Sequence, residues 1–241
     1  MVFASWCFLS TLFIDRENVM KIIIGSESFA PNVSGVAVFA ERMAREMARR
    51  GHEVYVFAPG RSFKTCYDTA FKDIKVFRLR SLPNPFREGF RIAFLPASDV
   101  ASEVRKIKPD IIHLQDPTAI CGALIEAGKR NKIPVIATNH FSIEFIIAYI
   151  RYLKLFYPIV LPIVSWYISR FYNKCTLLTA PSPTARQKAL KMGTKTEVLV
   201  ISNGIDTKRF HPASEANEAR RYLGLPEKPI VLYLGRIDKD K

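Results

Sequence analysis

The apolar positions of the chain follow two different periods, and these periods predict its secondary structure. Residues 21–24 form a short continuous β-branched run, which is typical of a strand buried on both faces of a parallel sheet. Across residues 36–48 the apolar positions recur every three or four residues, with Arg and Glu on the remaining face, as in an amphipathic helix. Gly51 follows, where a left-handed residue commonly ends a helix. With a strand at 54–58, residues 20–58 predict one strand, helix and strand unit.

The same alternation of predicted strands and helices continues along the rest of the chain. We expect further strands at residues 74–79, 111–114, 135–138, 176–180, 197–201 and 230–234, with a proline-bearing loop at 82–86, and helices at 97–107, 118–131, 181–192 and 215–223. This order predicts an α/β fold, a Rossmann-like parallel sheet with helices on both faces.

The predicted elements also suggest boundaries. The first strand starts directly at Met20, and the preceding residues have neither a basic start nor a small-residue cleavage site, so we expect a leader outside the fold. We therefore divide the chain into a leader at 1–19, a main domain at 20–212, a helix and linker at 213–229, and the first strand of a further, truncated domain at 230–241.

Composition narrows the range of partners. The chain has 241 residues, 49% of them hydrophobic, and a formal net charge of +14, which favours nucleic acid, an anionic membrane surface or a phosphorylated substrate. The basic residues are scattered and no nucleic-acid-binding motif is present, so we expect no nucleic acid partner. The four Cys and four His residues are too dispersed for a zinc site or a disulfide framework. A reduced, cytoplasmic protein without a metal site is the simplest interpretation.

Candidate site residues lie where the predicted strands end. In open α/β sheets ligands bind beyond the carboxyl ends of the strands, close to helix N-termini. Ser34 and Gly35 precede the first helix, Asp116 follows the strand at 111–114, and His140 follows the strand at 135–138. A purely structural interpretation stays open, in which Ser34 and Gly35 form a tight turn and His140 caps a helix. A nicotinamide-binding enzyme is disfavoured, because that fingerprint needs three glycines and here there is one.

Residues 141–174 are unusually apolar for a soluble domain. Their longest charge-free run, 155–169, is shorter than the ~20 residues of a spanning helix, and Pro158 and Pro162 interrupt it. Aromatic residues with a basic fringe are typical of a segment lying in the headgroup region of a membrane. A core helix pair with a surface for a partner is the alternative.

An ordered series of segments carries a family resemblance. PNVSGVAVF with RRGHEV, DIIHLQDP, PVIATNHF, APSPTARQKAL, VISNGID and VLYLGRIDKDK occur in this order between Met20 and Lys241. The series resembles the retaining glycosyltransferases of the GT-B fold, family four, which includes phosphatidylinositol mannosyltransferases and glucosyl-diacylglycerol synthases. Many members carry two adjacent glycines where this chain has Ser34 and Gly35, a variant similar to the lipid-modifying branch.

The resemblance implies a role for each candidate. Family members pair an acceptor-side domain with a donor-side domain, and this chain would supply the first. His140 would contact the donor sugar as the catalytic histidine. The donor phosphates would be bound by Gly35, Arg236 and Lys241, and the acceptor by Ser34, Asp116 and Glu144.

The resemblance also implies an activity and its partners. We expect transfer of a hexose from a nucleotide-diphosphate sugar to a hydroxyl group with retention, on a lipid or sugar acceptor at an anionic membrane surface. We expect no cofactor and no metal, a peripheral membrane location, and little activity from this polypeptide alone. A sugar-nucleotide epimerase of the same fold and a non-catalytic membrane- or partner-binding domain remain alternatives.

Overall fold

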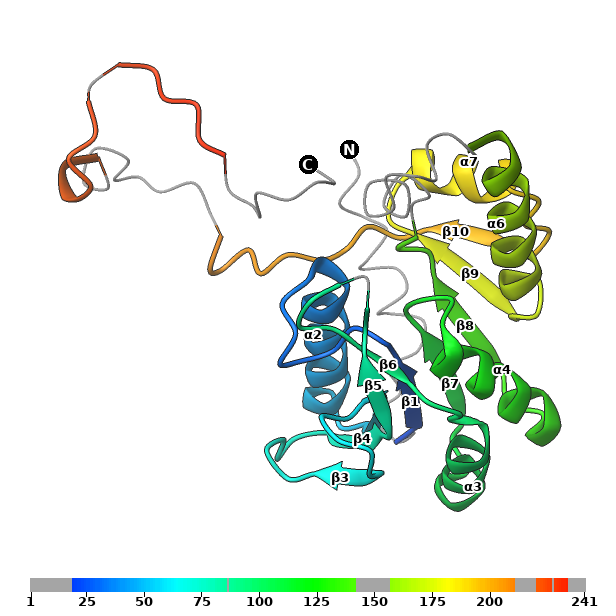
Figure 1. The fold of residues 1–241 in the computed structure, drawn as a ribbon. Helices are drawn as coiled ribbons and strands as arrows, with labels where there is room; N and C mark the ends of the chain where they lie inside the picture. Colours follow the sequence, from blue (N-terminus) through cyan, green and yellow to red (C-terminus); the bar gives the residue numbers. More distant parts are fainter. Residues whose placement is uncertain (1–18, 86, 142–156, 211–219, 227, 234–241) are drawn as a thin grey trace. The chain divides into compact units, whose positions relative to one another are not determined.

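The computed structural model describes the greater part of the chain as two compact units, residues 1–202 and residues 203–241. Figure 1 draws both. The residues described are 19–85, 87–141, 157–210, 220–226 and 228–233.

The first unit is built on an eight-stranded sheet with the order β10-β9-β8-β7-β1-β2-β4-β3. All neighbouring pairs are parallel except β3 and β4. A separate antiparallel ribbon pairs β5 with β6. The strands are β1 (Lys21–Gly25), β2 (Glu53–Pro59), β3 (Cys66–Asp68), β4 (Lys75–Leu79), β5 (Ser81–Pro83), β6 (Arg91–Ala93), β7 (Ile111–Leu114), β8 (Val135–Thr138), β9 (Leu177–Ala180) and β10 (Val198–Val200).

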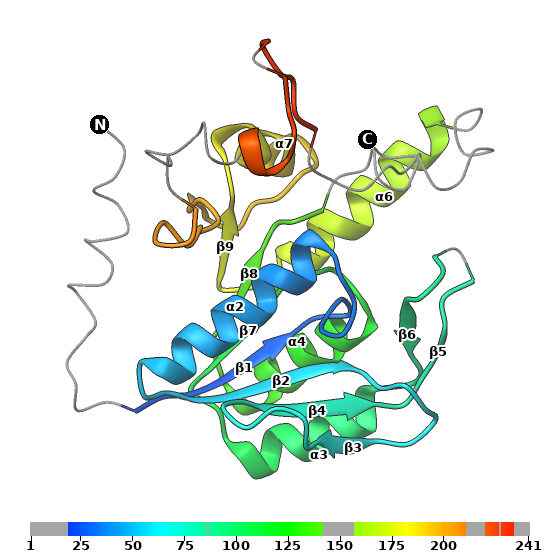
Figure 2. The same cartoon turned by 90° about the vertical axis from the view of Figure 1, so that its left-hand side faces the viewer.

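Helices cover both faces of this sheet, as Figure 2 shows for α2 on one side and α3 and α4 on the other. Successive side chains of β1 point to opposite faces of the sheet and pack against different helices. Ile22 and Ile24 pack in the cluster that contains α2, whereas Ile23 packs in the cluster that contains α3, α4 and α6. The helices are α2 (Gly35–Arg49), α3 (Ala97–Ile107), α4 (Ala119–Asn131), α6 (Tyr157–Tyr172) and α7 (Pro183–Lys191). The predicted α/β fold, a Rossmann-like sheet covered on both faces, is confirmed.

Helix α2 begins and ends where the sequence indicates. The hydroxyl group of Ser34 accepts a hydrogen bond from the amide of Ala37 and caps the N-terminus. At the other end Gly51 adopts a φ of +94°, a conformation that favours glycine. Small residues on the buried face allow the helix to lie close to the sheet.

Three short strands were missing from the sequence prediction. β3 is a three-residue edge strand, β5 overlaps the proline-bearing loop expected at 82–86, and β6 lies beyond that loop, where we expected no regular element. Strands this short carry too few positions to show a period, and pairing defines them. Pro83 is compatible with β5 because the ribbon has only two strands, so each has an open edge.

The second unit has little regular structure in its described part. The carboxylate of Asp206 accepts hydrogen bonds from the amides of Lys208 and Arg209, which stabilises a turn that follows it. The strand expected at 230–234 is wrong for residues 230–233, which form no strand. A strand is defined by pairing with a neighbouring strand, and no strand of the described residues pairs with residues 230–233. Of the helix expected at 215–223, only 220–223 lie within the described residues, and 220–222 are helical.

Two glycines of α4 provide a matched test of packing. A Cβ added at Gly128 would lie 2.7 Å from Cγ2 of Val135 and 3.3 Å from the carbonyl oxygen of Ile133, whereas a Cβ at Gly122 would meet nothing within 4 Å. Gly128→Ala is therefore expected to lower the free energy of unfolding by about 2 kcal/mol through overpacking. Gly122→Ala should raise it by about 0.5–1 kcal/mol, because alanine favours the helix. Urea unfolding of both variants checks this, and equal effects would contradict the close approach of α4 to β8.

Candidate functional site

The sheet reverses its order between β1 and β7, and this reversal defines the candidate site. From β1 the chain proceeds through β2 to β4 on one side, and then returns to β7, β8, β9 and β10 on the other. The two central strands are parallel, with Gly25 opposite Leu114, so their carboxyl ends lie together. Such a switch point is where open α/β sheets bind ligands.

Asp116 lies at this switch point and fixes the loops around it. Its Oδ2 atom accepts hydrogen bonds from the amide of Glu27 at 2.8 Å and from the hydroxyl of Ser26 at 3.2 Å. Its Oδ1 atom accepts from the hydroxyl of Thr118 at 2.6 Å and the thiol of Cys121 at 3.3 Å. Burial raises the pKa of Asp116 above its ordinary value. These contacts join the loop after β1 to the start of α4, and contact of Asp116 with an acceptor stays a prediction.

Glu27 is a half-buried acid at the same place, and the sequence analysis missed it. Its Oε1 atom accepts a hydrogen bond from the amide of Ala93 in β6 at 2.5 Å. Its Oε2 atom is buried and has no hydrogen-bond partner among the described residues. Burial, followed by the nearby charge of Asp116, raises the pKa of Glu27 from 4.5 to about 7. The side chain therefore changes its charge close to neutral pH.

The N-terminus of α2 is open to a ligand. Ser34 is held by its cap bond to the amide of Ala37 at 3.1 Å and by the hydroxyl of Ser28 at 2.7 Å. A Cβ added at Gly35 would meet nothing within 4 Å, and its φ lies outside the left-handed region. The backbone therefore does not require glycine here. The absence of a side chain leaves space beside the first amides of the helix, where anions bind favourably.

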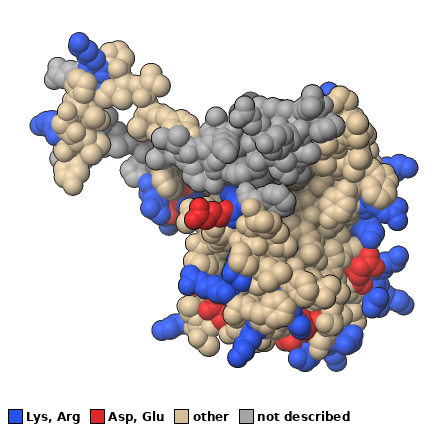
Figure 3. Space-filling view, viewed as in Figure 1, with Lys and Arg blue, Asp and Glu red and all other residues tan. Residues whose placement is uncertain are grey.

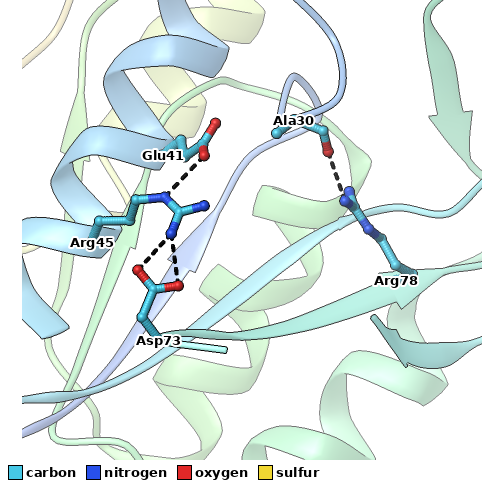
Figure 4. Close-up of polar contacts among 5 residues, drawn as sticks. All are labelled: Ala30, Glu41, Arg45, Asp73 and Arg78. Carbon is cyan, nitrogen blue, oxygen red and sulfur yellow. Dashed lines mark hydrogen bonds and ion pairs between the residues drawn. The ribbon is translucent and has the colours of Figure 1, made fainter. Parts of the chain in front are cut away.

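Two arginines anchor the elements that carry this loop, as Figure 4 shows. The guanidinium group of Arg78 donates a hydrogen bond to the carbonyl oxygen of Ala30 at 2.6 Å, which ties the loop before α2 to β4. On the helix itself, Arg45 pairs with Glu41 at 3.0 Å and with Asp73 at 2.6 Å. Arg78 is buried, so its contact is shielded from solvent, whereas the Arg45 pairs are exposed and contribute little stability.

His140 follows β8 and faces α2. Its Nε2 atom lies 3.1 Å from the Oε1 atom of Gln115, which follows β7. The ring of Phe39 meets the imidazole edge-on, with centroids 4.9 Å apart. Phe39 is one turn beyond Gly35, so His140 lies beside the first turns of the helix. Burial lowers the pKa of His140 to about 4, and the ring is neutral at pH 7.

A row of polar side chains crosses the sheet next to His140. The imidazole Nε2 of His113 lies 2.8 Å from the hydroxyl of Thr138, which in turn lies 2.9 Å from the hydroxyl of Thr179. Burial, followed by the neighbouring His140, lowers the pKa of His113 to about 4. The two histidines thus have separate hydrogen-bond partners.

A cavity of about 770 Å³ lies beyond the carboxyl ends of β1, β2 and β4. Two acids, Glu27 and Asp68, line it together with four basic residues: Arg61, Lys64, Arg78 and Arg91. Arg78 and Asp68 form an ion pair at 3.0 Å. Its aromatic lining comes from Phe29, Tyr67 and Phe71. The mixture of cationic and apolar walls suits an anionic or polyhydroxyl group attached to an apolar body. Elsewhere on the unit, Lys and Arg side chains are scattered over the face seen in Figure 3 and acidic side chains lie between them.

The described structure holds four of the seven predicted site residues. Ser34, Gly35 and His140 lie along the first turns of α2, and Asp116 lies at the switch point. Glu144, Arg236 and Lys241 fall outside the described residues, so their predicted roles stay predictions. Glu27 and Gln115 are the additions that the structure makes.

Comparison with known proteins relates this chain to glycosyltransferases. A family model described as Glycosyltransferase Family 4 matches residues 33–209. A GDP-mannose-dependent alpha-mannosyltransferase of Corynebacterium glutamicum is 28% identical over 225 residues, covering 92% of this chain and 52% of the relative. An alpha-monoglucosyldiacylglycerol synthase of Acholeplasma laidlawii is 27% identical over 231 residues, covering 92% and 57%.

Solved structures agree on the fold. The crystal structure of Anabaena HepE in complex with UDP superposes with a TM-score of 0.56 at 18% identity, covering 85% of this chain and 50% of that one. A glycosyltransferase from Rickettsia africae gives a TM-score of 0.54 at 16% identity, covering 87% and 51%. The chain thus spans about half the length of the relatives it matches.

Proposed function

The chain belongs to glycosyltransferase family 4, and from that premise we propose that it forms the acceptor-side half of a GT-B hexosyltransferase. The complete enzyme would move a hexose from a nucleoside-diphosphate sugar to an acceptor hydroxyl with retention of the anomeric configuration. The observation that carries the proposal is the open helix N-terminus at Gly35, one turn from a Phe39 ring that packs on neutral His140.

The chemistry of the transfer explains why these groups are needed. Departure of a nucleoside diphosphate builds negative charge on phosphate oxygens, and fixed N–H groups and cations stabilise that charge in the transition state. In our proposal the first amides of α2 at Gly35 face the diphosphate, and Arg236 and Lys241 add the positive charges. His140, neutral at pH 7, offers a hydrogen bond to the sugar without competing for the phosphates. With cations in that role, the reaction would proceed without a metal.

We further propose that the acceptor is a membrane lipid and that its polar head enters the cavity beside Glu27. The basic side chains of the cavity other than Arg78, which is paired with Asp68, suit a phosphate or a hydroxyl-rich head group. Support also comes from the Acholeplasma laidlawii relative, which is named a glucosyldiacylglycerol synthase. Ser34, Asp116 and Glu144 stay our candidates for contacts with the acceptor.

An acceptor-dependent assay tests the proposed activity. We expect the protein that carries this chain with a donor-side domain to release nucleoside diphosphate from GDP-mannose or UDP-glucose only when a lipid acceptor is present, also in EDTA. The 241-residue chain alone should release little. Release of nucleotide with an epimerised sugar and no acceptor would identify an epimerase instead. No release with any acceptor would support a binding module.

Membrane contact is the remaining part of the proposal, and α6 supports it. Ile159, Ile163 and Trp166 lie on one face of this helix and are each about 60% exposed. The opposite face, near its C-terminal end, packs into the core through Phe171 and Tyr172. Of the apolar segment at 141–174, residues 157–172 form this helix, whereas 142–156 lie outside the described residues. Within the described part of the chain, no helix has the length and apolar content to span a bilayer.

Co-sedimentation with vesicles tests this contact. We expect the chain to pellet with anionic vesicles of phosphatidylglycerol and phosphatidylcholine, less so at 0.5 M NaCl, and hardly at all with phosphatidylcholine alone, because basic side chains attract the surface before apolar ones insert. Trp166→Ser should weaken binding several-fold, since it removes an exposed interfacial aromatic side chain. Leu82→Ser, also at an exposed apolar side chain but outside α6, serves as the control. An equal loss of vesicle binding in both variants would show that α6 does not make the membrane contact.

A further inference from the structure

Gln115 is a fully buried side chain that contacts His140. It directly follows β7, and His140 follows the neighbouring parallel strand β8, where Leu114 lies opposite Ala137. The carboxamide oxygen of Gln115 lies 3.1 Å from Nε2 of the imidazole. An amide oxygen can only accept, so this hydrogen bond requires a proton on Nε2.

The tautomer of the ring follows from that bond. A neutral imidazole carries one N–H, and a proton on Nε2 leaves Nδ1 as an acceptor. The structure records no hydrogen bond to Nδ1 of His140 within the described residues. Phe39 packs against the ring at an interplanar angle of 65°, which restricts its rotation. The imidazole is therefore held in one orientation, and its Nδ1 lone pair has no partner among the residues that the structure describes.

We propose that Gln115 is a positioning residue that holds His140 in the Nε2–H tautomer, so that Nδ1 accepts a hydrogen bond from a hydroxyl group of the bound sugar. This inference rests on the proposed function for the identity of the ligand. A neutral, tautomer-locked histidine fits a sugar hydroxyl better than a phosphate, because it offers a lone pair where a phosphate needs a donor.

A purely structural role explains Gln115 poorly. The Nε2 atom of its amide is buried and has no partner among the described residues. An unpaired buried donor costs about 1–3 kcal/mol, so an apolar side chain of similar size would serve the core as well or better. Gln115→Met should therefore fold, which makes it a usable variant. The buried amide lowers the stability of the fold, and its contact with His140 explains why a glutamine is present at this position.

NMR of the histidine rings in the 241-residue chain tests the inference without any substrate. Two-bond ¹H–¹⁵N spectra distinguish the two tautomers. We expect His140 to show the Nε2–H form at pH 7, and Gln115→Met to lose that preference. Gln115→Glu should raise the proton affinity of His140 about tenfold or more, because a carboxylate next to the ring favours imidazolium.

Thr138→Val is the matched control. Its hydroxyl lies 2.8 Å from Nε2 of His113, so this variant should alter the signals of His113 and leave the tautomer of His140 unchanged. An Nδ1–H tautomer of His140 in the unmodified chain would overturn the inference. So would an unchanged His140 titration in a folded Gln115→Glu variant.

The two proposals fail separately. The NMR measurement uses neither donor nor acceptor, so a wrong tautomer leaves the acceptor-dependent assay untouched. If His140 shows the expected tautomer but the protein transfers no sugar, the proposed transferase activity is wrong and the positioning of His140 by Gln115 still holds.

Discussion

Replacing His140 with alanine is expected to lower kcat/KM about 100-fold in the transferase that contains this chain. Loss of a fixed hydrogen-bonding group at the reacting centre typically costs 10²–10³ in rate, which is about 3–4 kcal/mol. Folding should be retained, because the imidazole makes one side-chain hydrogen bond and one aromatic contact in the described structure. Initial rates of nucleoside diphosphate release with saturating lipid acceptor measure the effect.

The same substitution at His52 provides the control. Its Nδ1 atom accepts a hydrogen bond from the amide of Met20 at 3.3 Å, at the amino ends of β1 and β2. The switch point lies at the carboxyl ends of the strands, so His52 is at the other end of the sheet. His52→Ala should therefore change the rate less than twofold. Full activity of a folded His140→Ala protein would count against our assignment of the site and favour a chain that only binds.

The sequence alone predicted the main sheet well because its strands are buried on both faces. A run such as residues 22–24 has no polar position to accommodate, and it lies between two helical layers. β3, β5 and β6 could not be found in this way, because their existence depends on partners elsewhere in the chain. Cys66–Asp68 becomes a strand only through Arg78 and its neighbours in β4.

The candidate site was predictable in part for a similar reason. Strand ends point to Ser34, Gly35, Asp116 and His140, since the crevice rule needs only the order of elements. Glu27 gave no such signal, although it immediately follows β1. Its importance comes from Asp116, which is 89 residues away in the sequence. A single acid after a strand is common and gives no signal of function in the sequence. Only burial and a second acid nearby, which the fold provides, raise its pKa.

Those two acids also explain why the switch point is electrostatically unusual. Asp116 is fully occupied by hydrogen-bond donors from both loops, whereas Glu27 has one oxygen satisfied and one buried without a partner in the described residues. Two carboxylates in one poorly solvated place disfavour simultaneous ionisation, so one of them takes up a proton at a higher pH. Glu27 is the one with the titration close to neutral pH.

This titration predicts how stability depends on pH. The pKa of Glu27 is about 7 in the folded chain, against an ordinary value of 4.5. Between these values the unfolded chain loses its proton and the folded chain keeps it, so stability falls as pH rises from 4.5 to about 7 and is then constant. At about 1.4 kcal/mol per pH unit, the full loss is about 3.5 kcal/mol.

Histidine titration runs in the opposite direction, so a single pH curve cannot isolate Glu27. Burial lowers the pKa of both His113 and His140 to about 4. The unfolded chain therefore binds these protons first, and stability rises with pH between about 4 and the ordinary histidine value of 6.5. The informative quantity is the difference between the unmodified chain and a Glu27 variant at each pH.

Glu27→Gln is expected to make the chain more stable at pH 8 by about 2–3 kcal/mol, and by less than about 1 kcal/mol at pH 5. The amide keeps an oxygen for the amide of Ala93 and carries no charge to bury. Urea unfolding at the two pH values measures both differences. Glu126→Gln, at an exposed pair with Lys174, should change stability by less than about 0.5 kcal/mol at either pH. A gain from Glu27→Gln that is the same at pH 5 and pH 8 would mean that the carboxyl group of Glu27 does not titrate between them.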